Sequence, residues 1–68
     1  MENFYTVNLF KAEDLEDDIK IFTHDYATQE VATKVLRILE SGLTNKGNYF
    51  VELLEYTTED TVHILYRS

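Results

Sequence analysis

The sequence predicts a small α+β domain in the order strand, strand, helix, strand, strand (ββαββ), with one amphipathic helix packed on one face of a four-stranded antiparallel sheet. Four stretches alternate apolar and polar residues with a period of two, and one longer stretch has the 3.6-residue period of a helix. A chain of 68 residues has room for one hydrophobic core, so we expect residues 1–68 to form a single domain.

The first two predicted strands are "FYTVNLF" (residues 4–10) and "IKIFTHDY" (residues 19–26), both rich in aromatic and β-branched residues. The acidic stretch between them is the shortest connection for an antiparallel hairpin. The alternative is a short helix within "KAEDLEDDIK", where Leu15 and Ile19 lie four residues apart. A full helix there competes with the β-favouring "IKIF", so a single helical turn inside the connection is the form of this alternative that stays open.

The clearest element is the helix predicted in "TQEVATKVLRILESG" (residues 28–42). Thr28 is a suitable N-cap, Glu30 lies in the first turn where the helix dipole favours an anion, and Gly42 suits the C-terminal stop. The periodicity indicates one apolar face, which we expect to be buried. Its members are Val31, Val35, Ile38 and Leu39, widened by Ala32, Leu36 and Leu43.

Two further strands are predicted in "NYFVELLEYT" (residues 48–57) and "TVHILYR" (residues 61–67). Before them, Asn45 and Gly47 are able to adopt positive φ in a turn, and "TTED" between them forms a polar hairpin loop. Consecutive hairpins pair the first strand with the second and the third with the fourth. Which strands meet in the middle of the sheet is left open by the sequence.

The predicted strands carry apolar side chains on both faces, although one helix can cover only one face of a four-stranded sheet. We expect the helix to cover one set of residues: Tyr5, Val7, Leu9, Ile19, Ile21, Val51, Leu53, Val62 and Ile64. We expect the opposite face to carry the other set: Phe4, Phe10, Phe22, Tyr26, Phe50, Leu54, Tyr56 and Leu65. These rings either fold over the sheet edges and under loops, or form an interface, as contiguous apolar patches generally do.

The chain has 13 acidic and 6 basic residues, giving a net charge of −7. Such a chain repels phosphate backbones and anionic membranes, so direct binding to nucleic acid or membrane is not expected. A basic protein surface is the favoured electrostatic partner. The sequence shows no signal-peptide pattern and no membrane-spanning run, and it lacks cysteine, so a cytoplasmic location in the producing or infected cell is expected.

The acidic run "AEDLEDD" is the densest charge cluster in the chain. A calcium-binding loop alternates ligands with spacers and needs a glycine at its sharp turn, and the run has neither feature. The first interpretation is an exposed loop that has no binding role and whose charges are solvated. A second interpretation is that its carboxylates imitate phosphates and occupy a basic nucleic-acid groove of another protein. They belong to Glu13, Asp14, Glu16, Asp17 and Asp18.

No pattern in the sequence predicts an enzyme, a cofactor or a metal. His24 and His63 are the only histidines, and without cysteine they do not supply the three or four ligands of a zinc site. Ser41 and Ser68 do not lie in a nucleophile elbow, and the chain's two glycines form no phosphate-binding loop. We therefore expect no catalytic residues and no metal ligands.

The leading hypothesis is a small, acidic, non-enzymatic protein-binding module. In kind it is similar to small phage or mobile-element proteins that disable a host protein, here by blocking a basic, nucleic-acid-binding surface. The carboxylates of the run supply charge, and Phe22, Phe50 and Tyr56 are the expected apolar anchors. Two alternatives stay open: a self-assembling structural or accessory homodimer that uses the aromatic sheet face, and a small-ligand sensor with a pocket between helix and sheet.

Overall fold

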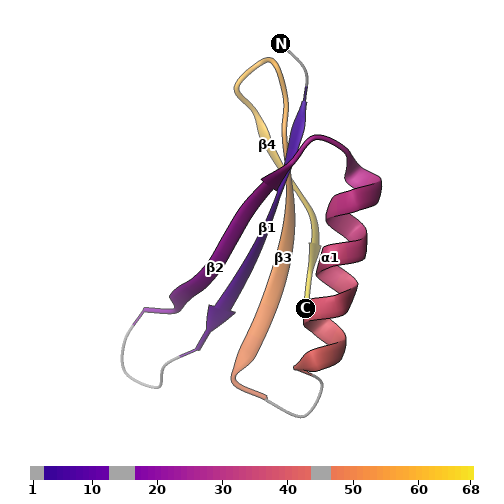
Figure 1. Ribbon diagram of the computed structural model, residues 1–68. Coiled ribbons are helices and arrows are strands. Elements are labelled where there is room, and N and C mark those ends of the chain that lie inside the picture. The colour runs from indigo at the N-terminus through magenta and orange to yellow at the C-terminus, as the bar shows by residue number, and fades with distance from the viewer. Residues whose placement is uncertain (1–2, 13–16, 44–46) are drawn as a thin grey trace.

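The computed structural model describes residues 3–12, 17–43 and 47–68 and confirms the ββαββ fold (Figure 1). One helix lies along one side of a twisted four-stranded sheet. The elements are β1 (Phe4–Lys11), β2 (Ile19–Tyr26), α1 (Gln29–Gly42), β3 (Tyr49–Tyr56) and β4 (Val62–Arg67).

The strand order in the sheet is β2-β1-β3-β4, with every neighbouring pair antiparallel. The predicted hairpins β1–β2 and β3–β4 are confirmed. The structure adds that β1 and β3 form the centre of the sheet, where residues 6–9 and 51–54 are buried. The two edge strands are β2 and β4, and every residue of β4 is exposed.

The predicted hairpin loop between β3 and β4 is confirmed. The Thr57 N–H donates to the Thr61 carbonyl (3.0 Å), and Asp60 adopts a positive φ of 61°, a conformation that aspartate tolerates better than most residues. The turn predicted before β3 differs, because Gly47 does not have a positive φ and Asn45 lies outside the described residues.

Helix α1 begins as the sequence predicts, because the Thr28 hydroxyl accepts a hydrogen bond from the Val31 N–H (3.3 Å). The end differs slightly: Gly42 is the last helical residue, and Leu43 is the C-cap, with its N–H bonded to the Glu40 carbonyl. The helix needs no left-handed glycine to stop.

The buried face of α1 is rotated from the predicted one. Ala32 and Leu36 are its most buried residues, whereas Val31 is 47% and Ile38 is 72% exposed. The prediction that Val31 and Ile38 meet the sheet is therefore wrong. Ala32 and Leu36 belong to the core cluster with residues of β1 and β3, so this part of the helix faces the sheet.

Thr28 offers a direct test of how the helix is held at its start. Replacing Thr28 with alanine is expected to lower the free energy of unfolding by about 1 kcal/mol, because the first helical turn loses a hydrogen-bond acceptor. Thr33→Ala is the matched control: it lies inside the same helix, where alanine has the better helix propensity. Urea titration followed by circular dichroism measures both, and equal losses would contradict the cap.

Both edge strands contain an irregularity that shifts their register against the centre of the sheet. In β2, Leu9 pairs with Phe22 but the next residue, Phe10, pairs with Lys20, so Ile21 is an extra residue. A β-bulge of this kind interrupts the alternation of faces. Phe22 therefore packs against the core on the helix side.

The same happens in β4, where Leu53 pairs with Tyr66 but Leu54 pairs with Ile64, so Leu65 is the extra residue. Bulges are common in edge strands, where they discourage uncontrolled pairing with other chains. The predicted faces of β2 and β4 are therefore partly wrong. Phe22, Tyr26 and Leu65 lie on the helix side, Val62 and Ile64 lie on the opposite face, and Ile19 and Ile21 are exposed.

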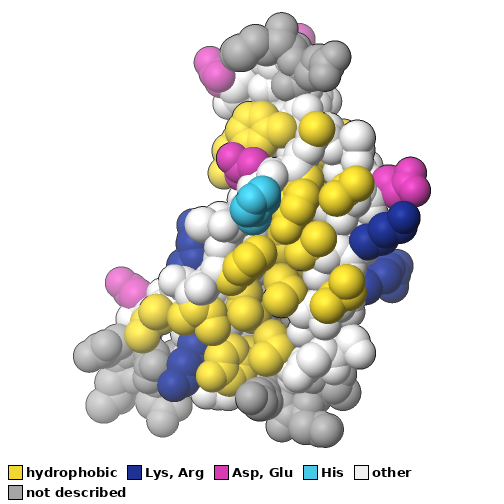
Figure 2. Space-filling view, in the orientation of Figure 1, with side chains coloured by type: hydrophobic (Ala, Val, Ile, Leu, Met, Phe, Trp, Pro, Cys, Tyr) yellow, Lys and Arg dark blue, Asp and Glu magenta, His cyan; other side chains and the backbone are white. Residues whose placement is uncertain are grey.

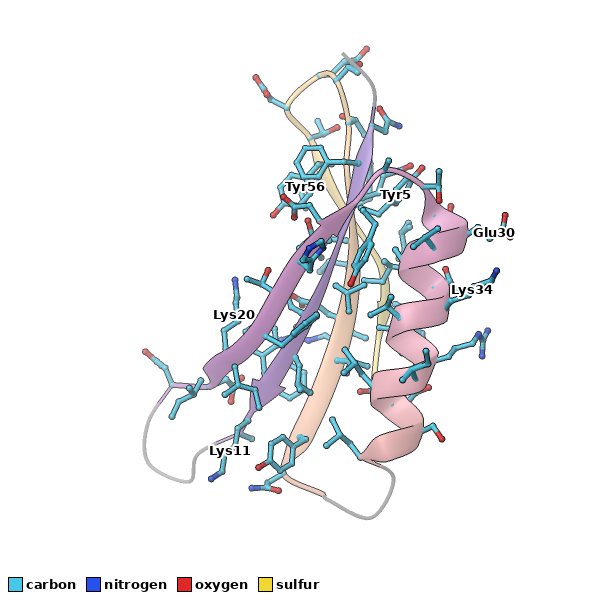
Figure 3. All side chains as sticks on the ribbon, viewed as in Figure 1. Tyr5, Lys11, Lys20, Glu30, Lys34 and Tyr56 are labelled. Atoms are coloured by element: carbon cyan, nitrogen blue, oxygen red, sulfur yellow. The ribbon has the colours of Figure 1, made fainter. Side chains whose placement is uncertain are left out.

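The core lies between α1 and the two central strands. Its buried residues come two each from β1, α1 and β3, and they form one contiguous cluster. Partly buried residues, including Tyr5, pack around it, and Figure 3 shows Tyr5 between β2 and α1. The buried cluster is Val7, Leu9, Ala32, Leu36, Val51 and Leu53.

The connection between β1 and β2 holds the acidic run. Lys11 lies in β1 and Ile19 in β2, so the alternative of a full helix over this stretch is wrong. Residues 13–16 lie outside the described residues, and the single-turn alternative falls on them. Asp17 and Asp18 are described and exposed.

Candidate functional site

The face of the sheet opposite α1, called the far face here, is covered by no other described element. Helix α1 contacts β1, β2 and β3 on their other side. The strand register assigns the members of the far face. They are Phe4, Thr6, Asn8, Phe10, Lys20, Thr23, Asp25, Phe50, Glu52, Leu54, Tyr56, Val62, Ile64 and Arg67.

Two pairs of stacked rings lie at opposite ends of the far face. Phe4 stacks on Tyr56 with ring centroids 4.8 Å apart, and Phe10 stacks on Phe50 at 4.9 Å. Each ring covers part of its neighbour, so three of the four are half-buried and Phe4 is exposed. Cross-strand aromatic pairs of this kind stabilise the sheet and still leave ring surface for a partner.

Between the ring pairs the far face has a polar centre. The Asn8 side-chain amide donates to a Glu52 carboxylate oxygen (2.9 Å), and these residues are only 2% and 9% exposed. Arg67 Nε lies 3.9 Å from the other Glu52 oxygen, beyond hydrogen-bond distance. The Asn8 Oδ1 atom is buried and has no hydrogen-bond partner among the residues that the structure describes.

Opposite charges balance on this face. The Thr6 hydroxyl donates to the Asp25 carboxylate (2.6 Å). The Lys20 ammonium lies 5.7 Å from the centre of the Phe10 ring, and the Arg67 guanidinium lies 5.2 Å from that of Phe50, both within cation–π range. The far face thus carries two carboxylates and two bases, although the chain as a whole has a net charge of −7.

A second apolar surface lies on the helix side, between α1 and β2, and is called the apolar strip here. Figure 2 shows it as an almost continuous band of hydrophobic side chains. Ile38, at 72%, is the most exposed large hydrophobic residue described. Its exposed members are Ile19, Ile21, Val31 and Ile38, and its partly exposed members are Phe22, Tyr26, Val35 and Leu39.

Charges of both signs lie around the apolar strip (Figure 2). Asp17 and Asp18 are exposed and directly precede Ile19 at one end of the strip. Glu30, next to Val31, is paired with Lys34 at 3.5 Å, and Figure 3 shows both side chains pointing away from the sheet. The described carboxylates next to the strip are therefore Asp17, Asp18 and Glu30, and Glu30 is paired with Lys34.

The predicted site residues fall in three places. Asp18 and Phe50 line the same hollow at one end of the sheet, together with Arg67. Tyr56 stacks at the other end of β3, roughly 20 Å away at about 3.3 Å per residue, and Phe22 lies on the helix side. The structure thus separates the predicted anchors. Glu13, Asp14 and Glu16 lie outside the described residues.

The sequence did not identify the polar centre or the apolar strip. A signal for the former was present, because Asn8 interrupts an otherwise apolar central strand. The strip gave no separate signal, because its helix residues and Ile19 were expected in the core, and Phe22 and Tyr26 on the opposite face. The rotation of α1 exposes Val31 and Ile38, and the register of β2 places Phe22 and Tyr26 on the helix side.

Two tyrosines join the helix side of the sheet to carboxylates. The hydrogen bond that the Tyr5 hydroxyl donates to Glu55 (3.1 Å) raises the pKa of Tyr5 above its ordinary value of 10.0, with burial and the charge of Glu55 as further causes. A hydrogen bond from Tyr66 to Glu40 of α1 raises the pKa of Tyr66 in the same way. Both phenols are therefore held in the protonated form as donors.

A cavity lies between α1 and β4, where the alternative of a small-ligand sensor places its pocket. Its volume is about 240 Å³, and its lining includes Leu36, Leu53, Leu65 and Tyr66. Pockets for drug-sized ligands are typically about 300–1,000 Å³. The cavity is therefore small for such a ligand, and the Tyr66–Glu40 hydrogen bond lies at its lining.

The two histidines lie apart in the sheet, His24 in β2 beside the Tyr26 ring and His63 in β4 opposite Glu55. Within residues 3–12, 17–43 and 47–68, no three histidine, aspartate or glutamate residues come together as metal ligands. In the same part of the chain, no helix has the length and apolar character needed to cross a membrane. Comparison with protein-family models, curated proteins and solved structures finds no match to this chain.

Proposed function

We propose that this chain is a non-enzymatic protein-binding module that occupies a basic surface of another protein. The observation that carries the proposal is the apolar strip between α1 and β2. Exposed patches of contiguous hydrophobic residues generally mark interaction sites, and this one contains the most exposed isoleucine described.

Charge specifies the kind of partner. The net charge of −7 favours a target rich in lysine and arginine, and exposed Asp17 and Asp18 border the strip. The apolar residues supply buried area, and the carboxylates accelerate encounter and select against acidic proteins. A basic groove that binds nucleic acid is the target class with the best match, and a phage or mobile-element inhibitor of a host protein is a setting in which such a module acts.

The absence of cysteine from the chain is compatible with the reducing cytoplasm of a producing or infected cell, where we place this activity. The cavity between α1 and β4 is smaller than typical ligand pockets, so we rank the small-ligand sensor lower.

The experiment is capture from an extract of the producing or infected cell, with the bound protein identified and its isoelectric point recorded. Asp17→Asn/Asp18→Asn is expected to weaken capture of that protein roughly two- to thirtyfold, since each exposed ion pair contributes about 0.2–1 kcal/mol. Ile38→Ser is expected to weaken it further by removing apolar contact area.

The matched control is Glu59→Gln/Asp60→Asn, which removes two exposed carboxylates at the opposite end of the sheet, in the β3–β4 hairpin. It is expected to leave capture nearly unchanged, apart from a small effect on encounter rate. An acidic target, or equal capture by all variants, would exclude the proposal.

A further inference from the structure

We infer that the far face is the interface between two copies of this chain, which pack sheet against sheet with their helices outside. The inference concerns the face opposite to the apolar strip and does not depend on the function proposed above. A dimer of this form leaves both apolar strips open to other proteins.

The dimensions and the accessible surface of the protomer show that, among the described elements, its sheet has a second layer on one face only. Its extents are 38 × 24 × 15 Å, so its shortest dimension is that of one sheet with one layer of helix. Its accessible surface is 4973 Å², whereas a monomeric protein of this mass exposes about 4450 Å². An apolar sheet face is normally buried against another element, and no described element covers the far face.

The far face is large enough for an interface. Strands of eight residues spaced by about 4.8 Å make a face of roughly 26 × 19 Å, or about 500 Å² per copy in projection. Two copies together bury about 1,000 Å² in projection, which is near the lower limit for a specific interface. The uneven surface of the side chains adds to this area. The exposed residues Val62 and Ile64 add apolar area to that of the stacked rings.

Charge makes the far face complementary to itself. Within β2, Lys20 lies at the level of the Phe10–Phe50 pair, and Asp25 lies nearer the Phe4–Tyr56 pair. A two-fold axis that runs across the strands exchanges these ends, and brings Lys20 of each copy to the half of the far face that holds Asp25 of the other. The same rotation lays each pair of stacked rings over the other pair. A second copy therefore meets this balanced face without the repulsion that the net charge of −7 would otherwise cause.

The polar centre adds an independent observation. Asn8 Oδ1 is buried on this face without a partner among the described residues, although buried acceptors in folded proteins are nearly always hydrogen-bonded. Arg67, which lies at the level of Glu52, is the base of a second copy whose guanidinium N–H donors reach toward this centre when the two faces meet. The face therefore gains both apolar contact and hydrogen bonding when it is covered.

The test is analytical ultracentrifugation of the chain over a dilution series, with circular dichroism as the control for folding. The wild-type chain is expected to dimerise with a micromolar Kd. Ile64→Lys, on the far face, is expected to weaken dimerisation at least tenfold. Ile38→Lys is the matched control on the apolar strip, and it is expected to leave the Kd unchanged.

A charge exchange tests the orientation. Lys20→Asp and Asp25→Lys are each expected to weaken the dimer, because each places like charges opposite one another, and the double variant is expected to restore it. A wild-type chain that stays monomeric at about 100 μM would overturn the inference, since a micromolar Kd predicts mostly dimer there. So would equal effects of Ile64→Lys and Ile38→Lys, or a double variant no better than the singles. Capture of a basic target is measured separately, so either proposal can fail alone.

Discussion

Replacing Leu36 with alanine is expected to lower the free energy of unfolding by about 2–5 kcal/mol, the usual cost of removing a buried leucine side chain. Leu36 is 4% exposed and lies in the core cluster between α1 and the central strands. A domain of this length has a total stability of about 3–10 kcal/mol at 0.05–0.15 kcal/mol per residue. The variant is therefore expected to lose a large fraction of its stability and to unfold at a much lower urea concentration than the wild type.

Ile38→Ala is the matched control, because it removes a similar side chain from the same helix. Ile38 is exposed, so we expect its loss to change stability by less than about 0.5 kcal/mol. Urea unfolding followed by circular dichroism measures both variants at one protein concentration, since dimerisation would add a concentration-dependent term. Equal losses would mean that the helix presents a different face to the sheet.

The contrast between these two residues also shows where sequence reasoning was sufficient. The helix, its N-cap at Thr28 and its apolar character were predictable, because capping and periodicity are local properties. Its rotation was not, because seven apolar residues define a wide face. Packing of Ala32 and Leu36 into the core cluster, a tertiary event, selects one part of that face.

The strands likewise differ in how well the sequence predicted which residues lie on each face. β1 and β3 follow their predicted alternation, because each is paired on both sides and any slip would move a buried face into water. The edge strands β2 and β4 are paired on one side only, and each accommodates an extra residue, Ile21 or Leu65. Local sequence gives no sign of these bulges, which depend on the twist and ends of the assembled sheet.

The prediction of the candidate surfaces also succeeded on the central strands and failed on the edge strands. Phe50 and Tyr56 were correctly expected opposite the helix, since they lie on the regular strand β3. Phe22 was misplaced, because it lies next to the bulge of β2. A sequence pattern therefore located an apolar surplus, whereas the strand register was needed to divide it into the far face and the apolar strip.

The polar centre of the far face provides a second large expected effect. Asn8→Leu is expected to cost about 2–3 kcal/mol, because it leaves the Glu52 carboxylate buried without its hydrogen-bond donor. Glu52→Leu is expected to cost a similar amount, because both ends of the Asn8 amide are then unsatisfied. Each single substitution thus removes one partner of this hydrogen bond and leaves the other partner buried without it.

The double variant Asn8→Leu/Glu52→Leu is expected to be close to the wild type in stability, or more stable, because no buried polar group is left alone. The coupling energy between the two positions is then about 4 kcal/mol or more, measured by urea unfolding of all four proteins in a double-mutant cycle. Losses that simply add would show that Asn8 and Glu52 are hydrated independently. A large coupling would establish that a central strand tolerates asparagine because a carboxylate on the neighbouring strand accepts its hydrogen bond.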